Sequence, residues 1–418
     1  MTKEQKQDVK QVTKVIPKSG SLDFVTGWYI KAAEYIRFTK IRVGLVSTNS
    51  VAQGEQAIVL WKYLMHQKDV EIHFAHQTFK WNNEAKGKAA VFCVIIGFSC
   101  MKGLSKTLFS YPDIKGKPNA RSVKEINQYL LEASTIFIEP RSNPIHDEEL
   151  MIIGSSPLDS GCYVFTSEER ELFISNEPES EPYFRPYIGS KELINGNERF
   201  ILYLKGISPR ELTQMPSVMD LVNKVKEKRF SSKRKATHKL GYYPTELAED
   251  RFIDSDILVV PKVSSENREY IPIGFYGRPT VCSDKTFQIP NASFFLFGML
   301  NSNMHMAWMR VIGVRLKGDY SYSNTLVYNN FVFPEPTEKQ RIDIEKKAQK
   351  IFNVRAKYTD STLADLYNPI AMPPDLQKAH RDLDKSVEKA YGETFKTDED
   401  RVAFLFQKNQ EKAKGKIK

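Results

Sequence analysis

Hydrophobic positions in the first hundred residues alternate between helical and extended spacing. The two kinds of spacing follow one another as helix, strand, helix, strand, loop and strand. The expected elements are helices over 22–36 and 53–66 and strands over 41–47, 70–76 and 89–99. Short apolar strands separated by helices are typical of buried sheets in α/β folds. The pattern therefore predicts an α/β domain over residues 1–150.

The pattern changes after that domain. Short strand-like pieces separated by Pro and Gly predict a mixed α+β domain over 151–335, which includes a helix over 292–311. Helical spacing returns over 336–357 and 374–391. We therefore expect a helical C-terminal module, over 336–418, that ends in the lysine-rich sequence EKAKGKIK.

The composition is compatible with a polyanionic partner and excludes several other classes of protein. The 418 residues carry 61 Lys and Arg against 51 Asp and Glu, a net charge of +10. Hydrophobic residues at 41% exclude a mostly disordered chain, and no apolar run approaches the roughly 18 residues of a membrane span. Four cysteines without a CxxC pair and a polar start predict a cytoplasmic protein without disulfides, structural zinc or membrane attachment.

Positive charge is concentrated in one segment. Residues 224–239, KVKEKRFSSKRKATHK, hold eight Lys or Arg and one Glu. Lys233, Arg234 and Lys235 lie next to two serines, and such side chains are common ligands of DNA phosphates. A solvated basic loop without a partner would look the same.

Few motifs indicate a specific chemistry. The sequence contains no GxSxG, HExxH or Walker loop, and His73 and His76, three apart in an expected strand, do not predict a shared metal. Phe79 and Trp81 fall in the expected loop between two strands. Aromatic rings followed by polar residues at a strand end suit a pocket for an extruded base. The alternative is that both rings simply cover a hydrophobic core.

Several longer segments resemble one known family in order and spacing. They are SLDFVTGWYIKAAEYI (21–36), VGLVSTNSVAQGEQAIVLW (43–61), FAHQTFKWNNEAKGKAAVFCVIIGF (74–98), GSSPLDSG (154–161), RPYIGSKELINGNERF (185–200), VPKVSSENREYIPIG (260–274), FGMLNSNMHMAWMR (297–310), YSYSNTLVYNNFVFPEP (320–336) and LADLYNPIAMPPDLQKAH (363–380). Together they resemble the type IIL restriction–modification enzymes, the MmeI-like family. Members combine a nuclease, an adenine-specific DNA methyltransferase and a target-recognition domain in one chain. The resemblance implies the second half of a Rossmann-like class I methyltransferase sheet, then a target-recognition domain and a helical module.

Two motifs of that family are missing from this sequence. The glycine-rich loop for S-adenosylmethionine and the NPPF catalytic motif, which binds the target amine, both precede the matched region. Residues 1–19 resemble the segment that follows the NPPF motif in the family. Phe79 matches the family's second base-stacking residue. The strand over 41–47 would then lie in mid-sheet beside a strand that is not encoded here. We therefore expect a piece of a split or truncated enzyme that pairs with an upstream polypeptide, binding S-adenosylmethionine only with that missing half.

A candidate for base recognition follows the helix over 292–311. Lys317 and Asp319 are two apart, so in an extended segment they share a face, and together they suit one G·C pair. The resemblance implies that both, with Ser321 and a position near Lys285, determine base specificity. A solvated turn is the alternative. The expected phosphate contacts nearby are Arg268, Tyr270, Arg310 and Arg315.

These features predict part of a site-specific DNA adenine methyltransferase. The implied reaction transfers a methyl group from S-adenosylmethionine to the amine of a flipped adenine in double-stranded DNA. The alternative is a non-enzymatic DNA-specificity module that delivers sequence choice to a partner. A generic basic RNA- or DNA-binding protein is a third reading, against which the extended resemblance argues.

Overall fold

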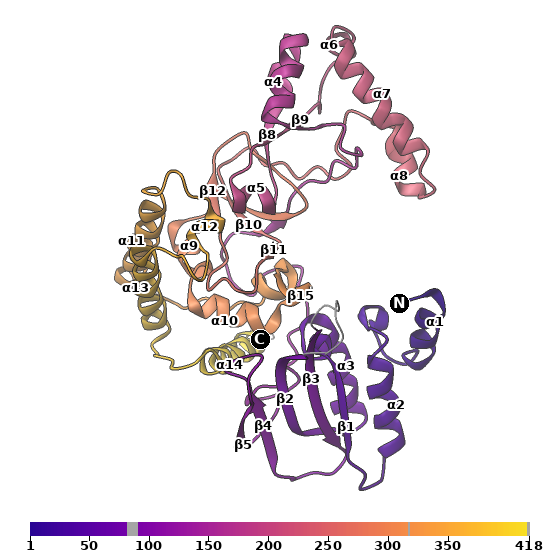
Figure 1. Cartoon of the computed structure of the whole chain (residues 1–418), viewed down its shortest axis with the longest axis vertical. Coiled ribbons are helices and arrows are strands. Elements are labelled where there is room, and N and C mark those ends of the chain that lie inside the picture. The colour runs from indigo at the N-terminus through magenta and orange to yellow at the C-terminus, as the bar shows by residue number, and fades with distance from the viewer. Residues whose placement is uncertain (82–90, 317, 416–418) are drawn as a thin grey trace. The chain divides into compact units, whose positions relative to one another are not determined.

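The protein folds into two compact units that combine distant parts of the sequence (Figure 1). The computed structural model describes residues 1–81, 91–316 and 318–415. Unit 1 contains Met1–His146, Asn303–Pro334 and Glu393–Lys418, and unit 2 contains Asp147–Ser302 and Glu335–Gly392. The units cut across the three sequential domains expected above, whose boundaries stay a prediction.

Unit 1 is built on a mixed sheet in which three strands point the same way. The strand order is β1-β3-β2-β4-β5, with bounds β1 Val43–Thr48, β2 Glu71–Trp81, β3 Val91–Ser99, β4 Lys106–Ser110 and β5 Asn119–Val123. β3 is antiparallel to β1 and to β2, and β4 is parallel to β2. The carboxyl ends of β1, β2 and β4 therefore meet at one edge, where α/β sheets commonly bind ligands.

Two helices cover one face of this sheet. α2 (Thr26–Ile36) and α3 (Gly54–Gln67) correspond to the two expected helices, and α1 (Lys3–Val12) precedes them. Tyr29 of α2 lies 5.8 Å from Trp61 of α3 and 5.9 Å from Phe98 of β3, measured between ring centroids. All three side chains are completely or almost completely buried. Their packing, together with the rest of the apolar stripes, fixes both helices on the Phe98 side of the sheet.

Later segments complete unit 1. They are α10 (Asn303–Ile312), β15 (Val314–Leu316), β16 (Asp319–Ser321) and α14 (Asp398–Gly415). Trp308 of α10 packs against Phe406 of α14, with ring centroids 5.7 Å apart. A C-terminal helix thus shares a core with segments that lie about a hundred residues earlier.

The single helix expected over 292–311 is wrong. The structure has α9 (Phe294–Leu300) in unit 2 and α10 in unit 1, divided at Asn301 and Ser302. The Asn301 amide donates to the carbonyl of Phe297, and the Ser302 hydroxyl donates to the carbonyl of Met299. Such side chains compete with the backbone for helical carbonyls, so the helix ends there.

Unit 2 is mixed α+β. Its two four-stranded sheets have the orders β12-β10-β14-β6 and β13-β8-β9-β7. The strands are β6 Ile152–Ile153, β7 Val164–Thr166, β8 Phe184–Ile188, β9 Arg199–Leu202, β10 Ile257–Pro261, β11 Val263–Ser264, β12 Gly274–Tyr276, β13 Val281–Cys282 and β14 Thr286–Pro290. The helices besides α9 are α4 Ser167–Asn176, α5 Ser190–Asn195, α6 Pro209–Thr213, α7 Pro216–Phe230, α8 Lys235–Lys239, α11 Glu338–Arg355, α12 Leu363–Leu366 and α13 Pro374–Tyr391.

The helices of the C-terminal segment close the core of unit 2. A Cβ atom at Gly298 of α9 would lie 3.1 Å from Ala348 and Ile344 of α11, so a glycine allows this close packing. α11 and α13 match the two helices expected after residue 335. Among the described residues, no helix is both long and apolar enough to cross a membrane.

Candidate functional site

At the carboxyl edge of the unit 1 sheet, the end of β1 and Phe79 of β2 flank the same residue of β3. Cys93 of β3 pairs with Thr48 on one side and with Phe79 on the other. Directly paired residues of antiparallel strands project to the same face of a sheet. Phe79 and the chain turning out of β1 therefore share one row on the face opposite α2 and α3.

A β-bulge in β2 lies immediately before Phe79. His76 pairs with Ile95 and Phe79 pairs with Cys93, so Gln77 and Thr78 oppose the single residue Val94. Bulges of this kind bend a strand and re-aim its side chains, and they are frequent beside active sites. The direction of the Phe79 side chain thus depends on the geometry of the bulge.

The expected loop position of Phe79 and Trp81 is wrong. Both residues belong to β2, because its pairing with β3 resumes after the bulge and continues to Trp81 opposite Val91. Aromatic side chains favour extended backbone, so the run QTFKW can continue the strand. The two rings still lie at the carboxyl end of their strand.

Phe79 belongs to a cluster of aromatic rings at this edge. Its ring stacks on Tyr111, which follows β4, with centroids 5.1 Å apart and planes inclined by 23°. His76 stacks on Phe109 with centroids 4.1 Å apart, and its Nδ1 lies 2.8 Å from the Tyr111 hydroxyl. The partly buried Phe79 and the 48% exposed Trp81 have centroids 6.0 Å apart. Rings held in this way offer π-faces that suit stacking on a base.

The polar members of the cluster are uncharged near neutral pH. Burial lowers the pKa of His76 and raises the pKa of Tyr111. The hydrogen bond between them therefore joins a neutral imidazole and a neutral phenol. A neutral, rigid surface favours stacking over binding of a phosphate.

A free strand edge lies at the β1 side of the sheet, with β3 between β1 and the aromatic cluster. Among the described residues, β1 pairs only with β3, so its other edge carries no strand. Val46 of β1 is 53% exposed, and Trp28 and Tyr35, seven residues apart on α2, are 61% and 77% exposed. An open edge flanked by exposed apolar side chains is an association surface.

The β15–β16 hairpin carries two of the expected base-reading residues. Leu316 pairs with Asp319 and Val314 pairs with Ser321, so Asp319 and Ser321 share one face. Lys317 lies outside the described residues. A readout role for these residues stays a prediction.

The hairpin is joined to the carboxyl edge of the sheet. Gly54 begins α3, soon after β1, and a Cβ atom there would lie 2.4 Å from the Val314 side chain. Gly54 also has a φ of +55°, a backbone conformation that favours glycine. This close approach fixes the hairpin beside the segment that leaves β1.

Two expected phosphate contacts also lie at the hairpin. The Arg315 guanidinium lies 4.0 Å from the centroid of the Tyr320 ring. Arg310 donates to Asp398 of α14 at 2.7 Å and to the Tyr320 hydroxyl at 3.3 Å. Arg310 joins the hairpin to α14, and Arg315 packs on Tyr320 within the hairpin. The contact of both arginines with phosphates stays a prediction.

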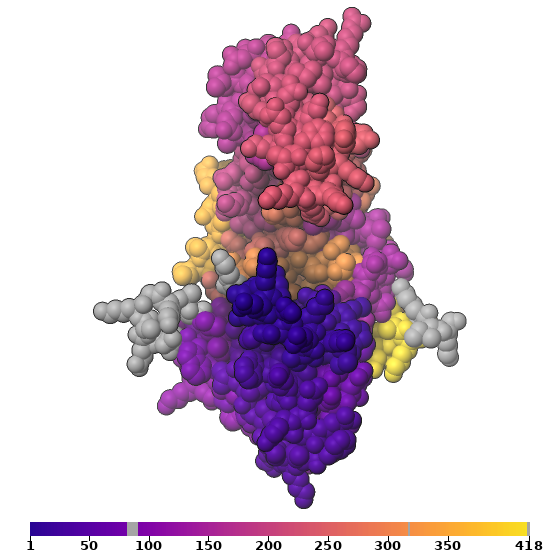
Figure 2. Space-filling model, turned by 90° about the vertical axis from the view of Figure 1, so that its right-hand side faces the viewer, coloured from indigo at the N-terminus to yellow at the C-terminus, as the bar shows by residue number. Residues whose placement is uncertain are grey.

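The basic segment of unit 2 divides into exposed and buried parts. Lys233, Arg234 and Lys235 are exposed where α8 begins. Figure 2 shows the surface of this rose-coloured part of the chain. Arg229, in contrast, is 1% exposed and donates to five backbone carbonyls. Three belong to Leu240, Tyr243 and Glu246, which follow α7, and two to Pro157 and Leu158, which precede β7. One of the eight basic residues therefore stabilises the unit and does not face solvent.

The other expected DNA contacts of unit 2 lie in different surroundings. Lys285 is exposed between β13 and β14 and forms an ion pair with Asp284 at 2.7 Å. Arg268 donates to the Ser264 hydroxyl at 3.3 Å. Tyr270 is 1% exposed, and its hydroxyl donates to Asp384 at 2.6 Å, so its expected contact with a phosphate is wrong.

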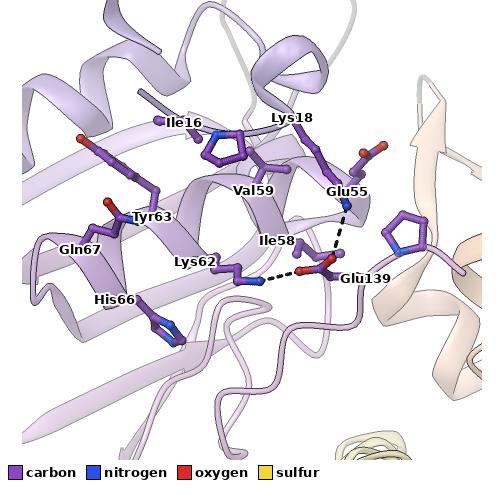
Figure 3. A pocket seen from close by; sticks show the side chains of 12 residues that line it. Ile16, Lys18, Glu55, Ile58, Val59, Lys62, Tyr63, His66, Gln67 and Glu139 are labelled. Atoms are coloured by element: carbon purple, nitrogen blue, oxygen red, sulfur yellow. Dashed lines mark hydrogen bonds and ion pairs between the residues drawn. The ribbon is translucent and has the colours of Figure 1, made fainter. Parts of the chain in front are cut away.

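A cavity of about 220 Å³ lies along α3 (Figure 3). Lys18 and Lys62 both point to Glu139, with ion-pair distances of 3.3 and 2.5 Å. The hydrogen bond from Lys62 holds the pKa of Glu139 below its usual range. Because the charges offset one another, this cavity is a weaker candidate than the aromatic edge.

Three family models cover almost the whole chain in sequence. They are the DNA-methyltransferase domain of MmeI over residues 1–110, its target-recognition domain over 132–335 and its C-terminal domain over 336–416. The chain belongs to the MmeI-like family. The resemblance expected from the sequence is thereby confirmed.

Two relatives of this family support the same assignment. DNA methyltransferase A of Bacillus subtilis (strain 168) is 37% identical over 411 residues, which are 98% of this chain and 46% of the relative. The solved structure of the type IIL restriction–modification enzyme MmeI in complex with DNA is 42% identical, with a TM-score of 0.92 over 99% of this chain and 55% of that one. This MmeI-like chain thus spans about half the length of these relatives.

Sequence reasoning missed several residues of the site. Phe109, Tyr111 and the bulge residue Gln77 carry no motif and are recognisable only through strand pairing. Arg229 did have a signal, because it continues the helical spacing of the buried Val218, Val222 and Val225.

Proposed function

We propose that this chain provides the base-stacking and DNA-reading parts of a site-specific DNA adenine methyltransferase. The observation that carries the proposal is the stacked pair Phe79–Tyr111 in the same sheet row as the end of β1. Phe79 would stack on an adenine flipped out of double-stranded DNA, and Tyr111 and His76 would hold the Phe79 ring in place. The residues over 1–110 belong to a methyltransferase domain, which supports this role.

The residues present fit a base better than they fit the methyl donor. S-adenosylmethionine supplies an electrophilic methyl group when bound, and its glycine-rich loop does not occur in this sequence. The described sheet offers aromatic rings at its carboxyl edge, and β1, two strands away from Phe79, leaves an edge open. We therefore place donor binding on further polypeptide that would add to the free edge of β1.

A partner polypeptide would also cover the exposed apolar residues. Val46, Trp28 and Tyr35 lie on β1 and on α2, which packs on the same sheet. Burying them would remove an association-prone surface. Size-exclusion chromatography with light scattering tests this: we expect self-association of the chain alone, whereas a well-behaved lone monomer would contradict the proposal.

A methylation assay tests the proposed activity. Labelled donor and plasmid DNA are mixed with the chain alone, or with the chain and a polypeptide that contains the glycine-rich loop and NPPF. We expect labelled N6-methyladenine, identified by mass spectrometry after digestion, only when both polypeptides are present. Donor binding and methylation by the chain alone would contradict the proposal that a second polypeptide binds the methyl donor.

A non-enzymatic DNA-specificity module is the second candidate. It is favoured by the exposed Lys233, Arg234 and Lys235 and by the β15–β16 hairpin, neither of which needs the donor. DNA binding without methylation by the assembled enzyme would support this candidate over the first.

A further inference from the structure

The first turn of α14 contacts the bulge of β2. Glu399 accepts a hydrogen bond from the Gln77 side-chain amide at 2.9 Å, and Gln77 also donates to the carbonyl of Leu130 at 3.0 Å. Gln77 is one of the two bulge residues between His76 and Phe79. Two acceptors therefore hold the side chain of the residue at which β2 bends.

An arginine of β5 strengthens this contact. Arg121 donates to Glu399 through Nη2 and to Glu132 through Nη1, the latter at 2.9 Å. The side chains of Arg121 and Glu399 are 39% and 36% exposed, so solvent screens the ion pair only in part. Because Arg121 has two carboxylate partners, the Glu399 carboxylate is held in one place.

The helix that carries Glu399 is itself anchored firmly. Thr397 caps α14 through the backbone amide of Asp400 at 3.1 Å, and Asp398 accepts from Arg310 at 2.7 Å. Further along, Phe406 is buried against Tyr129 and Trp308, with centroid distances of 5.7 Å to each. α14 is thus a rigid support from which Glu399 reaches the bulge.

We infer that Glu399, in the C-terminal segment of the chain, is a positioning residue for the base-stacking ring of Phe79. It acts through Gln77, which sets the bend of β2 and hence the direction of the Phe79 ring. This inference rests on the proposed methyltransferase function. It predicts that the C-terminal segment affects the methylation step and not only the stability of the fold.

A double-mutant cycle tests the inference in the assembled enzyme. Glu399→Ala should lower kcat for DNA methylation about tenfold with little change in KM, because a misplaced ring reduces productive orientation. In the Phe79→Ala background the same change should lower kcat less than about twofold further, since the ring that it positions is gone. Glu411→Ala is the matched control, because Glu411 lies on the same helix and its carboxylate bonds to Lys408 and Gln407 of that helix, away from the bulge.

Hydrogen exchange of the full chain separates positioning from unfolding. Glu399→Ala should speed amide exchange in 74–81 without a matching change in the core of α3, whereas Glu411→Ala should change neither. The inference would be overturned if the double variant lost kcat by the product of the two single losses, which would mean that the residues act independently. It would also be overturned if Glu399→Ala left amide exchange in 74–81 unchanged. A wild-type enzyme that methylates no DNA would instead overturn the proposed function.

Discussion

Phe79 and Tyr111 come from neighbouring parallel strand ends and stack with their ring centroids 5.1 Å apart. One face of Phe79 is therefore supported by protein, and the nearby Trp81 remains 48% exposed. A stacked, supported ring loses little conformational freedom when it binds a base. The pair accounts for how a bulged strand can present a rigid aromatic surface.

Removal of the Phe79 ring should weaken methylation strongly. Phe79→Ala deletes one stacking partner, worth about 1–3 kcal/mol per base, or roughly 5- to 150-fold in kcat/KM. Phe79→Tyr is the control, since it keeps the ring. Initial rates of labelled methyl transfer by the assembled enzyme measure both. Equal rates for Phe79→Ala and wild type would rule out stacking by this residue.

Exchange of the hairpin charges should alter one position of the recognised sequence. Lys317→Glu combined with Asp319→Arg reverses donor and acceptor, and one wrong base pair costs about 1–3 kcal/mol. Sequencing of methylated sites in a random DNA library measures the preference. Leu316→Ala is the control, because Leu316 is 55% exposed and pairs with Asp319 on the same face. An unchanged preference would remove the hairpin from base readout.

The exposed basic segment should contribute salt-dependent affinity. The triple variant replaces Lys233, Arg234 and Lys235 by Ala. In a plot of the logarithm of the DNA association constant against the logarithm of the salt concentration, its slope should be smaller by about 0.9 for each phosphate that these side chains neutralise. Fluorescence anisotropy with a short duplex at several salt concentrations gives this slope. Alanine at the exposed Lys339, Lys346 and Lys350 of α11 keeps the net charge change equal. If both triple variants reduce the slope equally, the effect belongs to total charge and not to this segment.

Acidification should destabilise the fold through His305. Burial lowers the pKa of His305 to about 3, and Tyr322 lies 2.8 Å from its Nε2 atom. The unfolded chain takes up this proton near pH 6.5, so the stability that His305 contributes is complete above that pH and is lost as pH falls toward 3. His305→Gln should therefore show a smaller fall in Tm between about pH 7 and pH 5 than wild type.

An exposed histidine provides the comparison for this measurement. His66 is exposed on α3, where its ring lies edge-on to Phe137, and His66→Gln removes one histidine without changing the surroundings of His305. Identical pH profiles for wild type and His305→Gln would show that other groups cause the acid sensitivity.

Local patterns predicted most elements of the fold, and long-range contacts account for what they missed. The helices α2, α3, α11 and α13 and the strands β1 and β3 lie within a few residues of the expected ranges. α1 was not expected because its sequence is polar, yet Thr2 and Gln5 form a capping box that starts it. The bulge in β2 has no local signature, since it arises from the register with β3.

The candidate site was predictable in part. The resemblance identified Phe79, whereas Tyr111, Gln77 and Glu399 could not be found, because only folding brings β4 and α14 to the same strand end. The burial of Arg229 is not visible in the charge of its segment and is indicated only by its helical spacing with the buried valines of α7.

The close approach of Gly54 to Val314 has a practical consequence for transplanting recognition between relatives. A chimera that receives only residues 147–302 from a relative would gain that relative's basic segment. It would keep its own β15–β16 hairpin. A graft that takes 303–334 as well must bring a side chain that fits against a glycine, or the new hairpin will push the first turn of α3 away from the sheet. A graft that includes the hairpin should therefore keep a side chain at position 314 that fits against Gly54.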